Sequence, residues 1–355
     1  MRVGSARRKG VLGLVSARSI SSAVVAICSN GVWTEVSGTG RRTGLRRASG
    51  LEKISDRLFN SDVERRPAGR AVVVTGASSG IGRTTVLRLA AAGYRVFAGV
   101  RRDQDAHRLV ADVRGDVVPV RLDVTDADQV AAVAARMATE QDGAGVHGLV
   151  NNAGATLLGP WERVSLEEFR QLLEVNVVGQ MAMIQALLPH LRRAGGRVVN
   201  IGSMAGRVAG PVFGPYAATK FALEGASDAL RREVRGQGVH VVLVEPGAIA
   251  TPIWGKASLR LDPTGPDDVY GDLLAGVRHG IVERSAQHGM SPDAVAAVVL
   301  RALTVSRPRT RYVVGRDARA RVRLAGLLPD RFVDTTLVGV ISRVGRAQRS
   351  GGTAR

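Results

Sequence analysis

Residues 71–82 read AVVVTGASSGIG, an apolar and largely β-branched run that passes directly into closely spaced glycines. Four apolar residues bounded by glycines are typical of a buried parallel strand, and the Leu- and Ala-rich stretch 83–92 has helical spacing. Gly76, Gly80 and Gly82 let the backbone turn sharply and approach a pyrophosphate, while the start of the helix presents unpaired N–H groups to it. The stretch therefore predicts a nucleotide-binding strand, loop and helix.

The glycines are spaced as TGxxxGxG, and a series of short motifs follows them along the chain. No single motif is specific, because glycine-rich turns and Tyr/Lys pairs are common, but the ordered set is. Through this set the chain resembles the short-chain dehydrogenase/reductase family over roughly residues 70–315. The motifs that carry the resemblance are Asp123-Val124, Asn151-Asn152-Ala153-Gly154, Asn176, Ser203, Tyr216 with Lys220, and Pro246-Gly247 with Thr251.

Beyond residue 70 the chain alternates short apolar runs with helical stretches, which is typical of βαβ units. We therefore predict an α/β fold with a doubly wound, parallel, Rossmann-type sheet in a single domain at 67–315. The resemblance implies a substrate-binding loop at about 253–290, and a basic amphipathic tail is predicted at 316–355. Strands are expected at 71–75, 94–100, 117–121, 146–150, 196–201, 239–244 and 311–314, and helices near 81–92, 103–112, 126–139, 165–193, 215–235 and 291–304.

Residues 1–66 differ in kind from the rest, with 13 Lys/Arg against 5 Asp/Glu and no alternation of strand and helix patterns. We predict a disordered basic extension, or translated sequence upstream of the true start. An organellar targeting peptide is a third interpretation, because the segment is rich in Arg and Ser and poor in acids. Arg18 interrupts the most apolar part, 11–28, which argues against a membrane span or a secretory signal, and we expect a cytoplasmic protein.

The formal net charge of +19 is concentrated at the two ends of the chain. Residues 316–355 carry 9 Lys/Arg against 3 Asp/Glu, whereas residues 67–315 carry 28 against 23. The central part is only mildly basic and the chain has 4% aromatic residues, so no nucleic-acid partner is expected. Cys28 is the only cysteine, which excludes an internal disulfide, and the six histidines form no close pair, so no metal site is expected.

The end of the second expected strand indicates which dinucleotide is bound. An acidic residue about twenty positions beyond the glycines would accept the ribose 2′-hydroxyl of NAD, but this strand ends in Val100-Arg101-Arg102. A guanidinium there can bind a 2′-phosphate, so Arg101 favours NADP(H) over NAD(H). The alternative is that Arg101 and Arg102 are simply solvated, and the acidic Asp103 close by weakens the argument for a 2′-phosphate. The resemblance implies a cofactor site made of Gly76, Ser78, Ser79, Gly80, Ile81, Gly82, Arg101, Asp123, Val124, Asn152, Ala153, Gly154, Tyr216, Lys220, Pro246, Gly247, Ile249 and Thr251.

Tyr216 and Lys220 stand four residues apart on an expected helix, so both side chains project from one face. A carbonyl that accepts a hydride needs a proton on its oxygen, and a phenol with a pKa of about 10 serves this role poorly unless a nearby cation stabilises the phenolate. Lys220 can supply that cation. The resemblance implies that Tyr216 is the catalytic acid/base, that Lys220 also holds the nicotinamide ribose, that Ser203 orients the substrate oxygen, and that Asn176 supports a water relay. Taken singly, the Tyr/Lys pair could be an ordinary helix-surface pair and Ser203 a turn residue.

The resemblance thus implies an NAD(P)-dependent oxidoreductase that transfers a hydride between the cofactor and a secondary alcohol or carbonyl. Apolar residues within 253–290 and in the tail favour a lipophilic alcohol or ketone, and 146–154 and 307–328 look like the retinol- and hydroxysteroid-dehydrogenase branch of the family. A homodimer or homotetramer is expected, and the arginine-flanked tail is also compatible with contact to a membrane surface. The alternative is a non-catalytic, cofactor-binding regulatory protein on the same fold, which would have no need of Tyr216 or Lys220.

Overall fold

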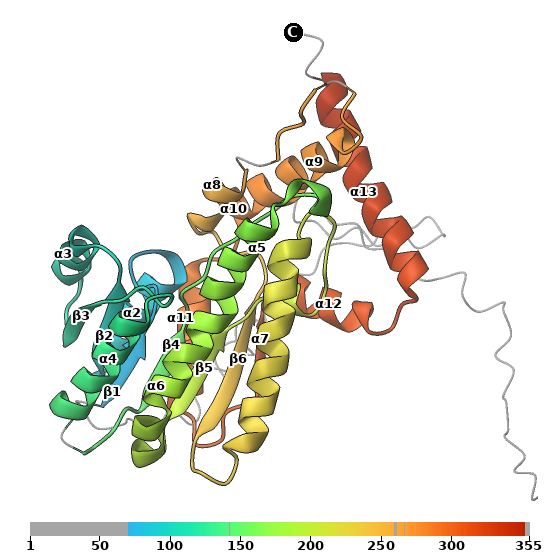
Figure 1. The fold of residues 1–355 in the computed structure, drawn as a ribbon. Coiled ribbons are helices and arrows are strands. Elements are labelled where there is room, and N and C mark those ends of the chain that lie inside the picture. The colour runs from blue at the N-terminus through green and yellow to red at the C-terminus, as the bar shows by residue number, and fades with distance from the viewer. Residues whose placement is uncertain (1–69, 142, 259–260, 266, 352–355) are drawn as a thin grey trace, which may run out of the picture. The chain divides into compact units, whose positions relative to one another are not determined.

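The computed structural model describes residues 70–351 apart from 142, 259–260 and 266, and the extension predicted over 1–66 lies outside the described residues. The strands are β1 (Ala71–Val74), β2 (Arg95–Val100), β3 (Val117–Arg121), β4 (Gly148–Asn151), β5 (Arg197–Ile201), β6 (His240–Pro246) and β7 (Arg311–Val314). They form one seven-stranded sheet in the order β3-β2-β1-β4-β5-β6-β7, and every neighbouring pair is parallel (Figure 1). The predicted doubly wound fold is confirmed, and each of these strands overlaps one expected from the sequence.

The central strands are apolar on both faces because helices cover both faces of the sheet. Every residue of β1, β4 and β5 is buried. Val73 of β1 is paired with Phe97 of β2 on one side and with Leu149 of β4 on the other. Such a strand needs a continuous apolar run and has no polar face, which explains why the AVVV stretch does not alternate.

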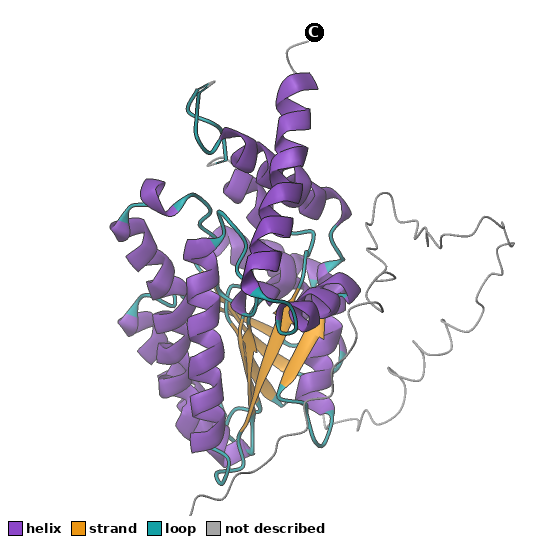
Figure 2. Cartoon of the chain, turned by 90° about the vertical axis from the view of Figure 1, so that its right-hand side faces the viewer, coloured by secondary structure: helices purple, strands orange, loops and turns teal. Residues whose placement is uncertain are grey.

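Helices pack in a layer on each side of the strands (Figure 2). One layer consists of α2 (Gly80–Ala91), α3 (Asp103–Asp112) and α11 (Pro292–Thr304), and the other of α4 (Ala127–Glu140), α6 (Gly179–Ala194) and α7 (Gly214–Glu233). The first of these helices follows the glycine loop, and the last carries the predicted Tyr/Lys pair.

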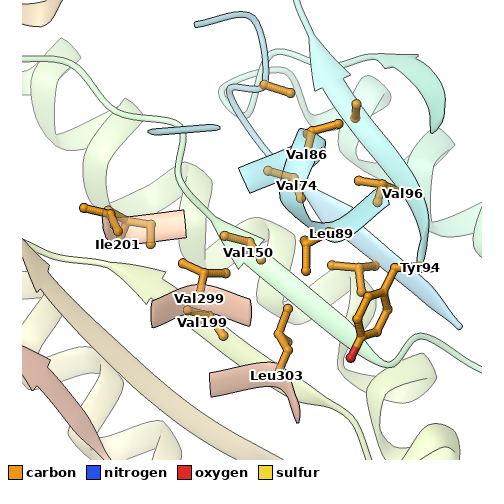
Figure 3. Packing of buried hydrophobic residues seen from close by; sticks show 14 of the residues in the cluster. Val74, Val86, Leu89, Tyr94, Val96, Val150, Val199, Ile201, Val299 and Leu303 are labelled. Carbon is orange, nitrogen blue, oxygen red and sulfur yellow. The ribbon is translucent and has the colours of Figure 1, made fainter. Parts of the chain in front are cut away.

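The core between the sheet and the first layer fixes the position of the glycine loop. Val74, Val150 and Val199 from three neighbouring strands pack with Leu89 of α2 and Leu303 of α11 (Figure 3). Each of the five is at most 3% exposed. Burial of a side chain such as Leu89 contributes about 1.5–3 kcal/mol, so α2 is held firmly against the sheet with its N-terminus at the strand ends.

The region beyond β6, predicted as a substrate-binding loop, contains short helices, and the tail is helical. The elements are α8 (Ile253–Ser258), α9 (Gly271–Val277), the π-helical turn η4 (Arg278–Glu283), α10 (Arg284–His288), α12 (Arg316–Ala325) and α13 (Asp330–Gly351). α13 packs along α9 (Figure 1). A Cβ on Gly276 would overlap the carbonyl oxygen of Ile341, and a Cβ on Gly345 would overlap that of Asp272, so the two helix backbones are in direct contact. The domain boundary at residue 315 stays a prediction.

Among the described residues, one helical stretch is long and apolar enough to cross a membrane by length and composition, Leu166–Ala194. Met183, Leu187 and Leu191 of this stretch are fully buried and belong to the core against the sheet. In this fold the stretch therefore has the position of a core helix.

Candidate active site

The functional residues expected from the sequence meet at one edge of the sheet. Gly76 follows β1, Arg101 follows β2, Asn152 follows β4, Ser203 follows β5 and Gly247 follows β6. Because the strands are parallel, all these positions lie at the carboxyl edge, and the winding of the chain reverses between β1 and β4. Ligands of open parallel sheets bind in the crevice at such a reversal, so the fold gathers the predicted cofactor residues around one site.

The glycine loop is closely packed against its surroundings. Gly76 has a φ of +63°, and a Cβ there would lie 2.9 Å from the Cα of Ala153. A Cβ on Gly82 would overlap the carbonyl oxygen of Gly76. α2 begins directly after Ser79, whose side chain makes no capping hydrogen bond, which leaves the first-turn N–H groups to an anion. The loop and helix therefore fit a pyrophosphate.

The segment after β4 is tied to the glycine loop by hydrogen bonds. Oγ1 of Thr75 accepts from the backbone nitrogens of Asn152 at 3.0 Å and Ala153 at 2.9 Å. Nδ2 of Asn152 donates to the carbonyl oxygens of Thr75 and Gly76, both at 3.0 Å. These bonds fix the Asn152-Ala153-Gly154 backbone beside the loop, where the predicted ribose site lies.

The loop after β6 approaches the glycine loop from another direction. Gly80 has a φ of +53°, and a Cβ there would lie 3.2 Å from the side-chain methyl of Thr251. Ile249 forms a parallel bridge with Met290, and the backbone nitrogen of Ala250 donates to the carbonyl oxygen of Met290 at 2.9 Å. The predicted nicotinamide-binding loop is therefore anchored to the segment that precedes α11.

The two arginines at the end of β2 differ in their surroundings. The side chain of Arg101 is 69% exposed, with Nη1 3.8 Å from Oδ2 of Asp123. Nε of Arg102 donates to Asp105 at 2.8 Å and Nη2 to the same carboxylate at 3.2 Å. Arg102 is thus held by its own helix, while Arg101 is the more loosely paired of the two.

Asn176 lies in an interruption of the helix that the sequence predicts as continuous over 165–193. The stretch is divided into α5 (Leu166–Leu173), the π-helical turn η2 (Glu174–Val178) and α6. The fully buried Asn176 accepts from the backbone nitrogen of Ala155 at 2.8 Å and donates to the carbonyl oxygen of Ala155 and to Oγ1 of Thr219, both at 3.0 Å. Three hydrogen bonds satisfy the carboxamide, and such π-helical turns are frequent at functional sites.

Ser203, Tyr216 and Lys220 converge where β5 faces α7. The side chains of Ser203 and Tyr216 are hydrogen-bonded, and Oγ of Ser203 also accepts from the backbone nitrogen of Ala205 at 3.1 Å. Nζ of Lys220 lies 5.8 Å from the centre of the Tyr216 ring and donates to the carbonyl oxygen of Ile201 at 2.9 Å. The structure thus brings together Ser203, Tyr216 and Lys220, three of the four residues that the sequence predicts for catalysis.

Burial changes the acidity of both ionisable groups. It raises the pKa of the Tyr216 phenol, and the hydrogen bond with Ser203 acts in the opposite direction. Burial lowers the pKa of Lys220 to about 8, against the charge of Glu224, which raises it. At pH 7 most Lys220 side chains are therefore still cations, and this charge stabilises a phenolate at Tyr216.

Sequence reasoning missed four residues at this site. Glu224 and Glu245 are buried acids, and their signals were a position eight residues after Tyr216 on the same helix and an acid within the apolar run 241–246. Thr219 binds the carboxamide of Asn176, and Val212 adopts a φ of +70° just before α7. A β-branched residue in that region costs about 1–3 kcal/mol, and no local pattern announces it.

An apolar cluster surrounds the ring of Tyr216. Trp254 of α8 and Leu337 of α13 are among the partly buried members. The tail therefore reaches the apolar cluster at Tyr216. The buried members are Leu158, Val212, Leu261, Leu274, Val277, Val282 and Ile341.

A cavity of about 200 Å³ adjoins this cluster and shares Leu158 and Leu274 with it. One wall is Arg163, which binds Asp268 of the predicted substrate loop through two hydrogen bonds of 2.8 and 2.5 Å. These bonds hold the pKa of Asp268 far below its usual range. The guanidinium also lies 4.9 Å from the centre of the Tyr270 ring, so this contact fastens the loop over the site.

Comparisons with known proteins agree with this geometry. The profile of the short chain dehydrogenase family matches residues 70–261. An NADPH-dependent 3-dehydrocapnine reductase from Ornithobacterium rhinotracheale is 37% identical over 270 residues, which cover 75% of this chain and 95% of that protein. Retinol dehydrogenase 5 from Mus musculus is 36% identical over 294 residues, covering 79% and 92%. The solved structure of a short-chain dehydrogenase from Streptomyces avermitilis is similar with a TM-score of 0.63 and 32% identity, covering 78% and 98%. The chain therefore belongs to the short-chain dehydrogenase family and is an NAD(P)-dependent oxidoreductase that acts on alcohol or carbonyl groups.

Proposed function

We propose that this chain transfers a hydride between NADP(H) and a lipophilic secondary alcohol or ketone, with Tyr216 as the acid/base. The observation that carries the proposal is the position of the Tyr216 side chain. Its hydroxyl is hydrogen-bonded to Ser203, its ring lies beside the Lys220 cation, and apolar residues of the substrate loop and tail pack around it. A substrate oxygen beside Ser203 would meet a proton donor and an apolar wall at once.

The roles of the side chains follow from this arrangement. When bound, the nicotinamide supplies or accepts the hydride. Tyr216 gives its phenol proton to the carbonyl oxygen during reduction and takes the hydroxyl proton during oxidation. Lys220 stabilises the phenolate that is left, and Ser203 orients the substrate oxygen by a hydrogen bond.

Asn176 has a supporting role in proton transfer. A Cβ on Gly154 would lie 3.4 Å from Oδ1 of Asn176 and 3.9 Å from Nζ of Lys220, so Gly154 leaves a space that borders both polar groups. We assign this space to a water that passes protons between Lys220 and solvent. The backbone of Asn176 belongs to a π-helical turn, and such turns are frequent at functional sites.

The loops after β1, β2, β3, β4 and β6, all at the carboxyl edge of the sheet, would hold the cofactor. The turn of Gly76, Gly80 and Gly82 would hold the pyrophosphate, Asp123 would hold the adenine, and the loop of Ile249 and Thr251 would hold the nicotinamide. The exposed Arg101 supports a preference for NADP(H), because a guanidinium at this strand end forms charge-assisted bonds with a 2′-phosphate. The name of the NADPH-dependent relative also supports this preference. The remaining residues proposed for the cofactor site are Ser78, Ser79, Ile81, Val124, Asn152, Ala153, Gly154, Tyr216, Lys220, Pro246 and Gly247.

The substrate is proposed to be lipophilic because of what surrounds the proton donor. Leu274 and Val277 of α9 and Ile341 of α13 are buried beside Tyr216, and a retinol dehydrogenase is among the relatives. Sugars or short hydroxy acids would leave their hydroxyl and carboxylate groups facing these aliphatic side chains without partners, which costs free energy. Bulky apolar alcohols and ketones would place apolar groups against these side chains and would not have this cost.

The test is Tyr216→Phe with Tyr312→Phe as the matched control, which removes a hydroxyl from the far strand β7. We expect kcat for Tyr216→Phe to fall by about 10²–10⁴-fold with cofactor affinity largely kept, because only the acid/base is lost. Assays use NADPH and NADP with a panel of alcohols and ketones, and cofactor affinity is measured by fluorescence titration. A Tyr216 variant as active as the control would favour the alternative function, a cofactor-binding regulatory protein.

We also propose a homodimer or homotetramer in the cytoplasm. Val178 of η2 and Phe221 of α7 are large apolar side chains exposed on neighbouring elements. Such exposed groups support an interface between copies of the chain. Light scattering of the purified protein gives the assembly directly, and a monomer at all concentrations would contradict it.

A further inference from the structure

Four ionisable side chains form a stripe along α7. Tyr216, Lys220, Glu224 and Asp228 follow one another at intervals of four residues, so they project from one face of the helix. Lys220 and Glu224 are buried, whereas Asp228 lies nearer to solvent. Along the stripe, the proposed proton donor Tyr216 is followed by the cation of Lys220 and then by the two carboxylates.

A second buried acid faces this stripe from the sheet. Glu245 of β6 is fully buried, with Oε1 3.3 Å from Nε of Arg311 and 3.8 Å from Nη1 of Arg207. Nε of Arg311 also donates to Oε2 of Glu224 at 3.0 Å, and its Nη2 lies 2.9 Å from Asp228. With Lys220, these are the charged groups that face the two glutamates.

The surroundings of the two glutamates indicate that one of them is protonated. Among the described residues, none donates a hydrogen bond to Oε1 of Glu224 or to either oxygen of Glu245. Two buried carboxylates repel each other, but a proton on Glu245 turns it into a donor toward Glu224. Burial and the neighbouring Glu224 raise the pKa of Glu245 to about 7. Burial also raises the pKa of Glu224, but the hydrogen bond from Arg311 opposes this change.

We propose that Glu224 and Glu245 share one proton, carried by Glu245, and that the negative charge left on Glu224 keeps Lys220 cationic beside Tyr216. Glu224 is then a positioning residue that acts through Lys220. Arg311 decides which glutamate is charged, because its Nε hydrogen bond favours the ionised form of Glu224. The inference rests on the proposed roles of Tyr216 and Lys220 in proton transfer.

The first test measures the proton directly and needs no activity. A buried, protonated carboxylic acid gives a carbonyl-stretch band in the infrared spectrum that a carboxylate lacks. The difference spectrum between the parent protein and Glu245→Gln at pH 6 should show the loss of this band. The spectrum of Asp228→Asn at the same pH should keep it. If Glu245→Gln loses no such band, the shared proton is excluded.

The second test follows the pH dependence of kcat/KM for alcohol oxidation. Glu224→Gln removes a negative charge one turn from Lys220, so Lys220 should lose its proton at a lower pH and then no longer stabilise the phenolate of Tyr216. We expect the alkaline limb of the profile to move to lower pH by about one unit. Asp228→Asn is the matched control on the same helix, and we expect it to move the limb much less. Glu224→Asp restores the charge and should bring the limb back toward its parental position.

The outcomes separate this inference from the proposed function. Equal shifts in Glu224→Gln and Asp228→Asn would overturn the role of Glu224, because a general loss of negative charge would then explain both. If Glu224→Gln does not fold, Glu224→Asp still tests the role of Glu224, and the infrared measurement still tests the shared proton. An active Tyr216→Phe would refute the proposed function, and the infrared band would still report whether the glutamates share a proton.

Discussion

Nδ2 of Asn176 donates a hydrogen bond to Oγ1 of Thr219 at 3.0 Å, and this contact joins the π-helical turn η2 to helix α7. Both side chains are fully buried. Thr219 donates in turn to the carbonyl oxygen of Tyr216 at 2.8 Å. The backbone of the proposed acid/base is therefore connected to a turn that lies 43 residues from Thr219 in the chain.

The first prediction follows from this contact. Thr219→Val keeps the shape of the side chain but leaves the buried amide of Asn176 without one of its acceptors. We expect the free energy of unfolding to fall by about 1–3 kcal/mol, measured by urea denaturation. Thr335→Val is the control, because Thr335 makes the same kind of hydrogen bond to a helix carbonyl at an exposed position of α13, and this variant should lose less than about 0.5 kcal/mol. Equal losses in the two variants would mean that the contact with Asn176 adds nothing to the free energy of unfolding.

The second prediction concerns the pairing of α9 with α13. A Cβ on Gly345 would overlap the carbonyl oxygen of Asp272, whereas a Cβ on Gly339 of the same helix meets nothing within 4 Å. Gly345→Ala should therefore displace α13 from the substrate loop, lower Tm and raise KM for apolar substrates. Gly339→Ala should leave KM unchanged and stabilise the helix by up to about 1 kcal/mol. Identical behaviour of the two variants would show that α13 does not shape the substrate site.

The third prediction concerns cofactor choice. Arg101→Asp replaces attraction for a 2′-phosphate by repulsion, so the ratio of kcat/KM for NADPH to that for NADH should fall about tenfold or more. Arg108→Asp makes the same charge change at an exposed position of α3 and should alter the ratio much less. An unchanged ratio in Arg101→Asp would refute the assignment of this arginine to the 2′-phosphate.

The fourth prediction is a pH dependence of stability. Burial and Glu224 raise the pKa of Glu245 from 4.5 to about 7, so the folded state binds this proton more tightly than the unfolded chain. The resulting stabilisation is complete below pH 4.5 and is lost as the pH rises through about 7. Glu245→Gln has no such proton to lose. We therefore expect the stability of this variant, relative to the parent, to increase between pH 5 and pH 8 in urea denaturation. A constant difference over this range would contradict the raised pKa.

Local patterns in the sequence predicted much of the fold and the family. The glycine loop at 76–82, the apolar strand runs and the order of motifs are all properties of neighbouring residues, so they can be recognised without the tertiary structure. The strands agree within about two residues with those expected. The interruption at Asn176 was not predicted, because the π-helical turn spans only five residues, Glu174–Val178, and its valines continue the apolar run of the helices on both sides.

The sequence by itself determined the order of the functional motifs along the chain. These motifs are the glycine loop, the arginine at the end of β2, and the pair of Tyr216 and Lys220 on one helix. Only the tertiary structure decided which distant residues surround that pair. Glu224 meets Arg311 across 87 residues of chain, Glu245 joins them from β6, and Ile341 reaches the Tyr216 cluster from the tail. These contacts depend on which strands are neighbours in the sheet and on which helices pack together, and no local pattern of residues contains that information.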